Sequence, residues 1–136
     1  MMRKIEIKGF IFDLDGVIAD TAPLHYKAWC KIGDQWGFKL SKARNEELKG
    51  VSRKDSILKI ANWAGKSFTE AELDGFALEK NENYLSYCQS LGTKDILPGV
   101  YDFIHASMNK GLKLAVGSAS KNAKIVLQKL GILNLF

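Results

Sequence analysis

Cysteine is scarce in this sequence, and the two cysteines present lie far apart. Cys30 and Cys88 form no CxxC pair in a chain of 136 residues. Zinc sites and disulfide frameworks need several cysteines at characteristic spacings. Neither kind of site is therefore expected, and both thiols are predicted to be reduced and buried.

Long apolar runs are missing as well. No stretch approaches the roughly 18 consecutive apolar residues that suggest a membrane span. Residues 1–6, MMRKIE, also lack the apolar stretch of a secretory signal. We therefore expect no membrane partner, and the predicted compartment is the cytoplasm.

The sequence has no block of like charges either. Its 20 Lys and Arg residues outnumber 15 Asp and Glu residues, giving a formal net charge of +5, but the basic residues are scattered along the chain. Scattered lysines usually form a solvated surface, and a phosphorylated substrate also favours positive charge, so no nucleic-acid partner is expected. The balance of 46% hydrophobic and 26% charged residues is typical of a globular domain with a packed core.

The sequence does contain two short apolar runs that are typical of buried strands. They are residues 5–12, IEIKGFIF, and residues 112–117, LKLAVG, and each ends at polar residues. Helices are predicted from Pro23, through most of 41–91, over 100–109, and from about Lys121 with Ser120 as N-cap. This order predicts an α/β fold with a parallel sheet, in which a core of residues 1–20 and 92–136 is interrupted by a helical insertion, residues 21–91.

The strongest chemical signal lies at the end of the first predicted strand, in FDLDGV, residues 12–17. Open parallel sheets bind ligands beyond the carboxyl ends of their strands, and side chains two apart in an extended segment share a face. Asp13 and Asp15 should therefore face one site, with Leu14 directed to the core. Close carboxylates favour a shared hard cation such as magnesium, and one of them could attack phosphorus while the other transfers a proton. Taken alone, a DxDG string can also be a surface turn or a calcium-like loop.

A second polar segment follows the second predicted strand. It consists of Ser118, Ala119, Ser120, Lys121 and Asn122. Hydroxyl groups, backbone N–H groups and the start of a helix would meet there, and such a place suits a phosphate group. Because serine is common as a plain helix cap, this segment is only suggestive by itself.

Together the two segments resemble a known family. FDLDGVIADT, residues 12–21, looks like the first signature motif of the haloacid dehalogenase (HAD) superfamily, and SASKNA, residues 118–123, is similar to the β-phosphoglucomutase form of the second motif. The resemblance implies an HAD-like Rossmannoid parallel sheet with an inserted all-helical cap. It implies that Asp13 is the nucleophile that becomes an aspartyl phosphate and that Asp15 is the general acid and base. Magnesium (Mg2+) would be held by the Asp13 carboxylate and the Asp15 backbone carbonyl.

The same resemblance assigns the substrate-binding residues. Ser118 would bind the phosphoryl group in transfer, and Ser120, Lys121 and Asn122 would hold the second phosphate of a sugar bisphosphate. Residues 20–29 and 48–56 resemble β-phosphoglucomutase cap segments. The cap residues implied to line the sugar side are Thr21, His25, Trp29, Lys49, Gly50, Val51, Arg53, Ser56 and Lys80. Arg53 can hold a phosphate with two hydrogen bonds, and His25 would couple cap closure to Asp15. The plainer alternative for each is a solvated helix charge or, for His25, a satisfied structural histidine.

The resemblance covers nearly all of the sequence and ends with it. The third-motif lysine and the fourth-motif acidic pair of the family have no counterpart here, so we expect an incomplete core sheet. An open sheet edge could pair with another chain, which makes self-association possible. The implied function is interconversion of β-glucose 1-phosphate and glucose 6-phosphate, with little or no turnover by this chain alone. The alternatives are a phosphatase of the same superfamily acting on a small phosphate ester, and a non-catalytic fragment or interaction module.

Overall fold

The computed structural model describes residues 2–136, and Met1 lies outside the described residues. Contacts divide the chain into two compact units. Unit 1 contains the residues up to Asp20 together with Leu91–Ser118 and Asn122–Phe136. Unit 2 contains Thr21–Ser90 and Ala119–Lys121.

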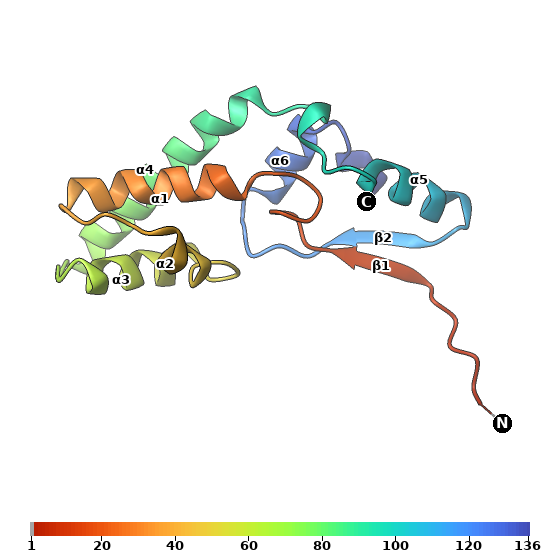
Figure 1. Ribbon diagram of the computed structural model, residues 1–136, viewed down its shortest axis with the longest axis horizontal. Coiled ribbons are helices and arrows are strands. Elements are labelled where there is room, and N and C mark those ends of the chain that lie inside the picture. Colours follow the sequence, from red (N-terminus) through yellow and green to blue (C-terminus); the bar gives the residue numbers. More distant parts are fainter. Residues whose placement is uncertain (1) are drawn as a thin grey trace. The chain divides into compact units, whose positions relative to one another are not determined.

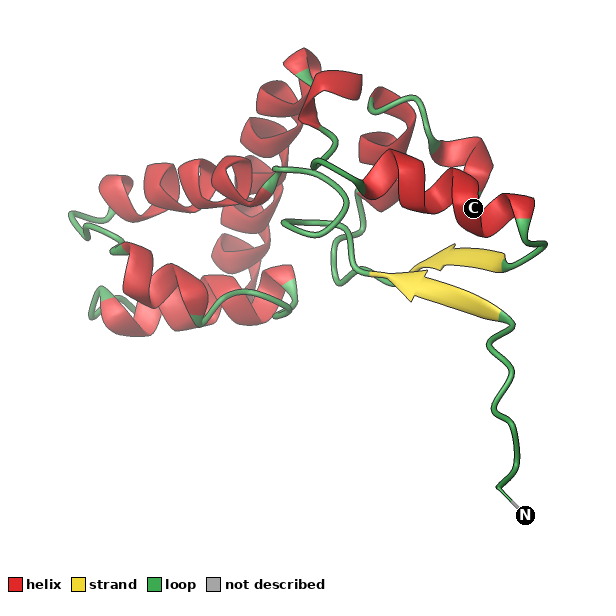
Figure 2. Ribbon diagram, turned by 45° about the vertical axis from the view of Figure 1, so that its right-hand side comes forward, coloured by secondary structure: helices red, strands yellow, loops and turns green. Residues whose placement is uncertain are grey.

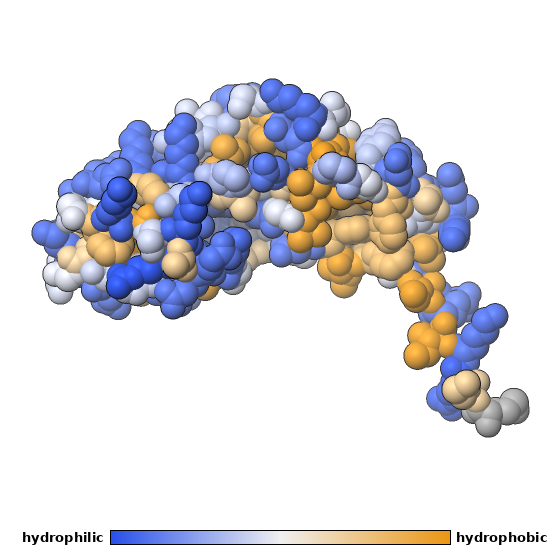
Figure 3. Space-filling view, in the orientation of Figure 1, coloured by the Kyte–Doolittle hydropathy of each residue, from blue (hydrophilic) through white to orange (hydrophobic). Residues whose placement is uncertain are grey.

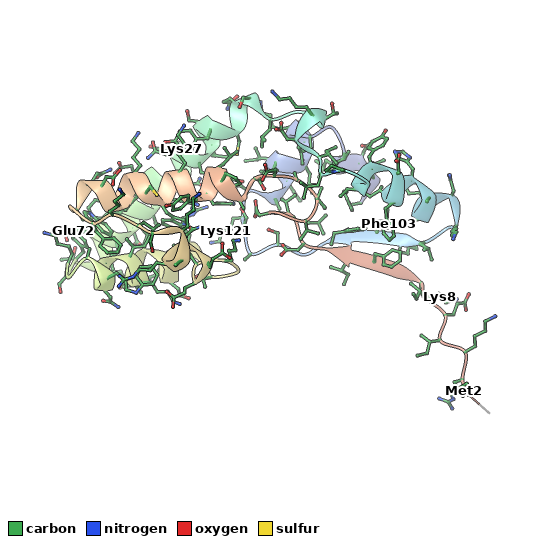
Figure 4. All side chains as sticks on the ribbon, viewed as in Figure 1. Met2, Lys8, Lys27, Glu72, Phe103 and Lys121 are labelled. Atoms are coloured by element: carbon green, nitrogen blue, oxygen red, sulfur yellow. The ribbon has the colours of Figure 1, made fainter. Side chains whose placement is uncertain are left out.

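Unit 1 is built on a parallel sheet, which in residues 2–136 consists of β1 (Gly9–Phe12) and β2 (Lys113–Val116) (Figure 1). The pairing runs in register from Gly9 opposite Lys113 to Phe12 opposite Val116. Phe103, in α5 (Val100–Asn109), covers one face of the sheet (Figure 4). Its ring centroid lies 5.1 Å from that of Phe10 and 6.0 Å from that of Phe12. The α/β fold with a parallel sheet, predicted from the sequence, is confirmed.

The face of β1 opposite α5 is exposed to solvent, so the prediction of a buried strand over residues 5–12 is wrong in part. Only Gly9–Phe12 form the strand, and Ile5, Ile7 and Ile11 are 90%, 58% and 80% exposed. Within β1, Ile11 alternates with Phe10 and Phe12, so it points away from the face that α5 covers. In the space-filling view, apolar and hydrophilic residues are mixed along the N-terminal segment (Figure 3).

The C-terminal part of unit 1 contains α6 (Ala123–Lys129) and the 3-10 turn η3 (Leu133–Leu135). The helix predicted from about Lys121 is present, but it starts later than expected, and the prediction of Ser120 as its N-cap is wrong. Residues 121–122 form a turn, and Asn122 occupies the N-cap position. The reason is that the first helical hydrogen bond runs from Val126 N to Asn122 O, so the helix begins two residues later than the serine would place it.

Unit 2 is helical apart from its connecting segments (Figure 2). Its elements are α1 (Ala22–Gln35), α2 (Lys42–Glu46), α3 (Arg53–Trp63), α4 (Glu70–Tyr87) and the 3-10 turn η1 (Cys88–Ser90). Helix α4 contacts both α1 and α3. The core between them includes Trp29, Ile32, Trp36, Ile57, Ile60 and Leu73.

Local sequence signals account for two helix starts in unit 2. The Ser52 hydroxyl accepts a hydrogen bond from Asp55 N at the start of α3. Thr69 and Glu72 form a complete capping box at the start of α4. Both caps are local, because capping depends on side chains three residues apart and needs no tertiary contact.

The two cysteines are free thiols, with Cys88 buried and Cys30 half-buried. Burial is the main cause that raises the pKa of the Cys30 thiol. Across the residues that the structure describes, no helix is both long enough and apolar enough to cross a bilayer.

Candidate active site

The two predicted motifs begin at the same edge of the sheet in unit 1. Phe12 and Val116 are register partners at the carboxyl ends of β1 and β2, and Gly117 N donates a hydrogen bond to Phe12 O at 2.8 Å. Asp13 directly follows Phe12, and Ser118 directly follows Gly117. Because ligands of open parallel sheets bind beyond this edge, the register brings both motifs to the place where a site is expected.

The loop after β1 presents its two carboxylates around a buried leucine. Leu14 is fully buried, as expected from the sequence, whereas Asp13 is exposed and Asp15 is half-buried. Leu14 N donates to Asp13 Oδ1 at 2.8 Å. The loop is closed by a hydrogen bond of 2.8 Å from Gly16 N to Ala19 O, and Gly16 has a φ of 76°, a conformation that favours glycine. The positions of the carboxylates are therefore set by a short, tightly bonded loop.

A later segment of unit 1 anchors this loop. Leu97 N donates to Ile18 O at 2.9 Å, and Asp20 N donates to Asp95 O at 3.1 Å. Asp95 lies in the 3-10 turn η2 (Thr93–Asp95), where its Oδ2 accepts a hydrogen bond from Gly92 N at 2.9 Å. In the sequence this segment predicts only a break between helices, so its role in holding the Asp13–Asp15 loop is visible only in the structure.

The donor chemistry of Asp13 and Asp15 fits magnesium. Proteins usually hold this ion through one or two carboxylates, with water and phosphate oxygens completing the coordination. In residues 2–136, this loop included, no group of three or more His, Cys, Asp or Glu side chains could hold a metal ion. Any metal at this edge would thus depend on these two aspartates, on backbone oxygens and on ligand or water oxygens.

The second motif is divided between the two units. Ser118 and Asn122 belong to unit 1, whereas Ala119–Lys121 belong by their contacts to unit 2, with Lys121 labelled in Figure 4. Asn122 is buried, Ser118 and Ser120 are half-buried, and Ala119 and Lys121 are exposed. Helix α6 follows these residues, and Asn122 provides no side-chain cap hydrogen bond to it. The polar groups that this segment offers to a phosphate are the two hydroxyl groups, the lysine and the amide of the motif.

Three of the predicted cap residues lie together inside unit 2. Lys80 is only 4% exposed, and its Nζ lies 2.9 Å from His25 Nδ1 and 4.4 Å from the centroid of the Trp29 ring. Tyr84 completes the group, because its ring stacks on His25 with centroids 4.0 Å apart and lies 4.9 Å from Lys80 Nζ. A buried ammonium group loses hydration, and the imidazole nitrogen and aromatic faces offset part of that cost.

The sequence analysis assigns no role to Tyr84. The signal that could have identified it is spacing: His25 and Trp29 are four residues apart on α1, and Lys80 and Tyr84 are four apart on α4. Residues at this spacing share a helix face, and α1 packs against α4. Thr21, another predicted residue, is fully buried just before α1 and makes no side-chain cap hydrogen bond there.

The segment before α3 carries the next three predicted residues. Lys49 is exposed and its Nζ lies 2.8 Å from Glu46 Oε1. An exposed ion pair of this kind contributes little stability, although it partly neutralises the lysine. Gly50 is exposed with a φ of 73°, and Val51 is half-buried.

Arg53 and Ser56 share one face of α3. Arg53 Nη2 donates to Asn81 Oδ1 at 2.9 Å, and partial burial lowers the pKa of the guanidinium group. Ser56 is 1% exposed, and its Oγ has no hydrogen-bond partner among residues 2–136. A buried hydroxyl group without a partner is costly, so its presence beside Arg53 marks this face as a candidate ligand contact.

Comparison with known proteins agrees with these features. Residues 7–136 match the family model for haloacid dehalogenase-like hydrolases. The chain belongs to this family. The resemblance drawn from the FDLDG and SASKNA motifs is thereby confirmed.

Individual relatives of the HAD family place the chain near the β-phosphoglucomutases. The beta-phosphoglucomutase of Bacillus subtilis (strain 168) is 36% identical over 132 residues, which cover 96% of this chain and 58% of that protein. A crystal structure of beta-phosphoglucomutase from Clostridium difficile has 43% identity and a TM-score of 0.93, covering 96% of this chain and 60% of that chain. The fructose-1-phosphate phosphatase of Escherichia coli (strain K12) is 29% identical, over 94% of this chain and 65% of its own length. The chain thus spans 58% to 65% of these relatives.

Proposed function

We propose that this chain carries the nucleophile and cap of a phosphotransferase that interconverts β-glucose 1-phosphate and glucose 6-phosphate. The observation that carries the proposal is the register of β1 and β2, which brings Asp13 and Ser118 to one sheet edge. Identity of 36% and 43% to two proteins named beta-phosphoglucomutase supports this substrate class. The partner is a small sugar phosphate, with no nucleic acid or membrane involved, and a cytoplasmic location is part of the proposal.

The reaction divides between the two carboxylates. The cycle begins with Asp13 phosphorylated. The C6 hydroxyl of β-glucose 1-phosphate attacks the Asp13 phosphoryl group and gives its proton to Asp15, so that the bond from phosphorus to Asp13 breaks and a sugar bisphosphate forms. In the second half-reaction the bisphosphate presents its other phosphate, and an oxygen of Asp13 attacks that phosphorus as the bond to the C1 oxygen breaks. Asp15 returns its proton to the C1 oxygen, which leaves glucose 6-phosphate and phosphorylated Asp13, the starting state.

Other side chains bind and orient the phosphoryl group. Ser118 would donate a hydrogen bond to its oxygens. The Asp13 carboxylate and the Asp15 backbone carbonyl would hold magnesium, which when bound supplies positive charge to the phosphoryl oxygens. Arg53 and the 120–122 segment would hold the second phosphate of the bisphosphate, and the remaining cap residues would line the sugar. His25 would link the cap to Asp15.

The test uses phosphorus NMR on the 136-residue chain with magnesium, β-glucose 1-phosphate and a small amount of glucose 1,6-bisphosphate, which supplies the first phosphoryl group to Asp13. Formation of glucose 6-phosphate by the wild type, but not by Asp13→Asn, would support the proposal. We expect slow turnover, because the chain spans 58% to 65% of its relatives. The more sensitive measurement is therefore the intact mass after incubation with glucose 1,6-bisphosphate, where one phosphoryl group should appear on the wild type and not on Asp13→Asn.

A phosphatase is the second candidate, because one relative is named a fructose-1-phosphate phosphatase. Release of inorganic phosphate that depends on Asp13 but gives no glucose 6-phosphate would favour it. If the wild type neither binds nor accepts a phosphoryl group from the bisphosphate, the proposal is wrong and a non-catalytic interaction module is favoured.

A further inference from the structure

We infer that Asn81 is a positioning residue that orients the Arg53 guanidinium group toward the second, non-reacting phosphate of the substrate. This inference rests on the proposed function, in which Arg53 is a phosphate ligand. The sequence analysis assigns no role to Asn81.

The first argument is geometric. Arg53 Nη2 lies 2.9 Å from Asn81 Oδ1, the usual length of a hydrogen bond, and the two residues are 28 positions apart. Arg53 begins α3 and Asn81 lies inside α4, and these helices contact each other. An arginine at a helix end can adopt many rotamers, so a hydrogen bond to the neighbouring helix restricts it before a ligand arrives.

The second argument is electrostatic. The nearby lysines are paired with carboxylates, Lys54 with Glu70 and Lys49 with Glu46. Arg53 has no carboxylate within ion-pair distance in the described part of the chain, and its partner is a neutral amide. The amide oxygen uses one of the five guanidinium N–H groups and leaves the positive charge intact. A carboxylate in its place would hold the arginine but cancel the charge that attracts an anion.

The third argument comes from the surroundings. Ser56 lies three residues after Arg53 on the same helix face, and its buried Oγ has no hydrogen-bond partner among residues 2–136. Ala119–Lys121, which include two residues proposed for the same phosphate, belong to the same compact unit as Arg53 and Asn81. A fixed cation and an unused buried hydroxyl group in one unit are what an oxyanion ligand needs.

The experiment measures the dissociation constant for glucose 6-phosphate by NMR titration of the 136-residue chain, so it needs no turnover. Asn81→Ala should weaken binding about five- to tenfold, the effect of losing one well-placed hydrogen bond. Asn81→Asp keeps the acceptor but adds a competing charge, so it should weaken binding more than about tenfold, with a loss that shrinks at high salt. The matched control is Asn83→Ala. Asn83 lies on α4, as Asn81 does, and its side-chain oxygen accepts a hydrogen bond from Lys31. Its removal should leave glucose 6-phosphate binding unchanged.

A double-mutant comparison separates positioning from a general structural effect. Arg53→Ala and Arg53→Ala/Asn81→Ala should bind equally, because Asn81 acts only through the arginine. An equal loss from Asn81→Ala with and without Arg53 would overturn the inference. The inference would also be overturned if Asn81→Ala bound glucose 6-phosphate with wild-type affinity while Arg53→Ala bound it weakly. If the wild type does not bind, or Arg53→Ala binds as well as the wild type, the proposed phosphate site is wrong and the inference is overturned with it.

A second measurement needs no variant that could misfold. In the free wild type, the hydrogen bond to Asn81 should slow rotation of the Arg53 guanidinium group, so that its Nη protons give separate NMR signals at low temperature. A single averaged signal, as expected for the exposed Arg3, would count against the inference.

Discussion

Lys80 Nζ lies 2.9 Å from His25 Nδ1, within hydrogen-bonding distance, although the two residues are 55 positions apart. An ammonium group can only donate, so Nδ1 of His25 acts as the acceptor and the ring proton of the neutral imidazole is on Nε2. The stacked Tyr84 ring holds the imidazole plane parallel to itself, with an interplanar angle of 11°. One tautomer and one orientation of His25 are thus selected inside unit 2.

Lys80→Met should abolish the preference of His25 for one tautomer, because the methionine side chain has no N–H donor. Nitrogen NMR of the neutral ring should show unprotonated Nδ1 in the wild type and a mixture of tautomers in the variant. Lys27→Met is the control, since its Nζ lies 4.2 Å from the Tyr87 ring centroid, away from His25. An unchanged His25 tautomer in Lys80→Met would show that another group sets it.

Gly9→Ala should destabilise unit 1. A Cβ at this position would overlap the backbone carbonyl oxygen of Lys113, so β1 and β2 would have to separate at that point. The expected loss in the free energy of unfolding is about 1–3 kcal/mol, as for other overpacked sites. Gly75→Ala is the matched control, since no atom lies within 4 Å of the place that its methyl group would take, and helix α4 should gain about 0.5–1 kcal/mol. Chemical denaturation monitored by circular dichroism measures both, and equal effects would contradict the prediction.

The exposed Glu70–Lys54 pair should make a small, pH-dependent contribution to stability. The hydrogen bond to Lys54 lowers the pKa of Glu70, and the hydrogen bond to Glu70 raises the pKa of Lys54. A lowered carboxyl pKa gives stability above the unfolded-state pKa that is lost as pH falls through the folded-state value. The raised pKa of Lys54 gives stability that is lost as pH rises through its folded-state value.

Glu70→Gln should therefore lower the unfolding midpoint slightly at neutral pH and not at acidic pH, with a smaller effect in high salt. The control is Glu82→Gln, an exposed glutamate on the same helix. A Glu70→Gln effect that persisted at acidic pH would show that the ion pair is not its cause.

Asp15→Asn should separate proton transfer from phosphoryl transfer. General acid catalysis contributes about 10²- to 10⁴-fold, so phosphorylation of Asp13 by glucose 1,6-bisphosphate should slow by that factor. Phosphorylation by acetyl phosphate should change much less, because acetate leaves without needing a proton. Intact-mass time courses measure both rates, and Asp20→Asn, which alters an exposed aspartate of the same loop, is the control. Equal slowing with both donors would contradict the role assigned to Asp15.

Local features of this protein follow from the sequence alone. The Thr69–Glu72 capping box and the Ser52 cap join residues three positions apart, and the start of polar residues after each apolar run marks the ends of β1 and β2. The HAD family is likewise readable from the FDLDG segment. The predictions that failed depend on wider surroundings: Ile11 is exposed because α5 covers only the opposite face of β1, and Ser120 does not cap α6 because that helix begins at Ala123.

Only the tertiary structure decided which distant side chains meet. The partnerships of Lys80 with His25 and of Arg53 with Asn81 span 55 and 28 residues, and no single stretch of the sequence indicates them. They arise because α4 packs against both α1 and α3, which brings polar groups from separate helices within hydrogen-bonding distance. Spacing along a chain specifies helix faces and caps, whereas the choice of partner across two helices depends on how their side chains fit together.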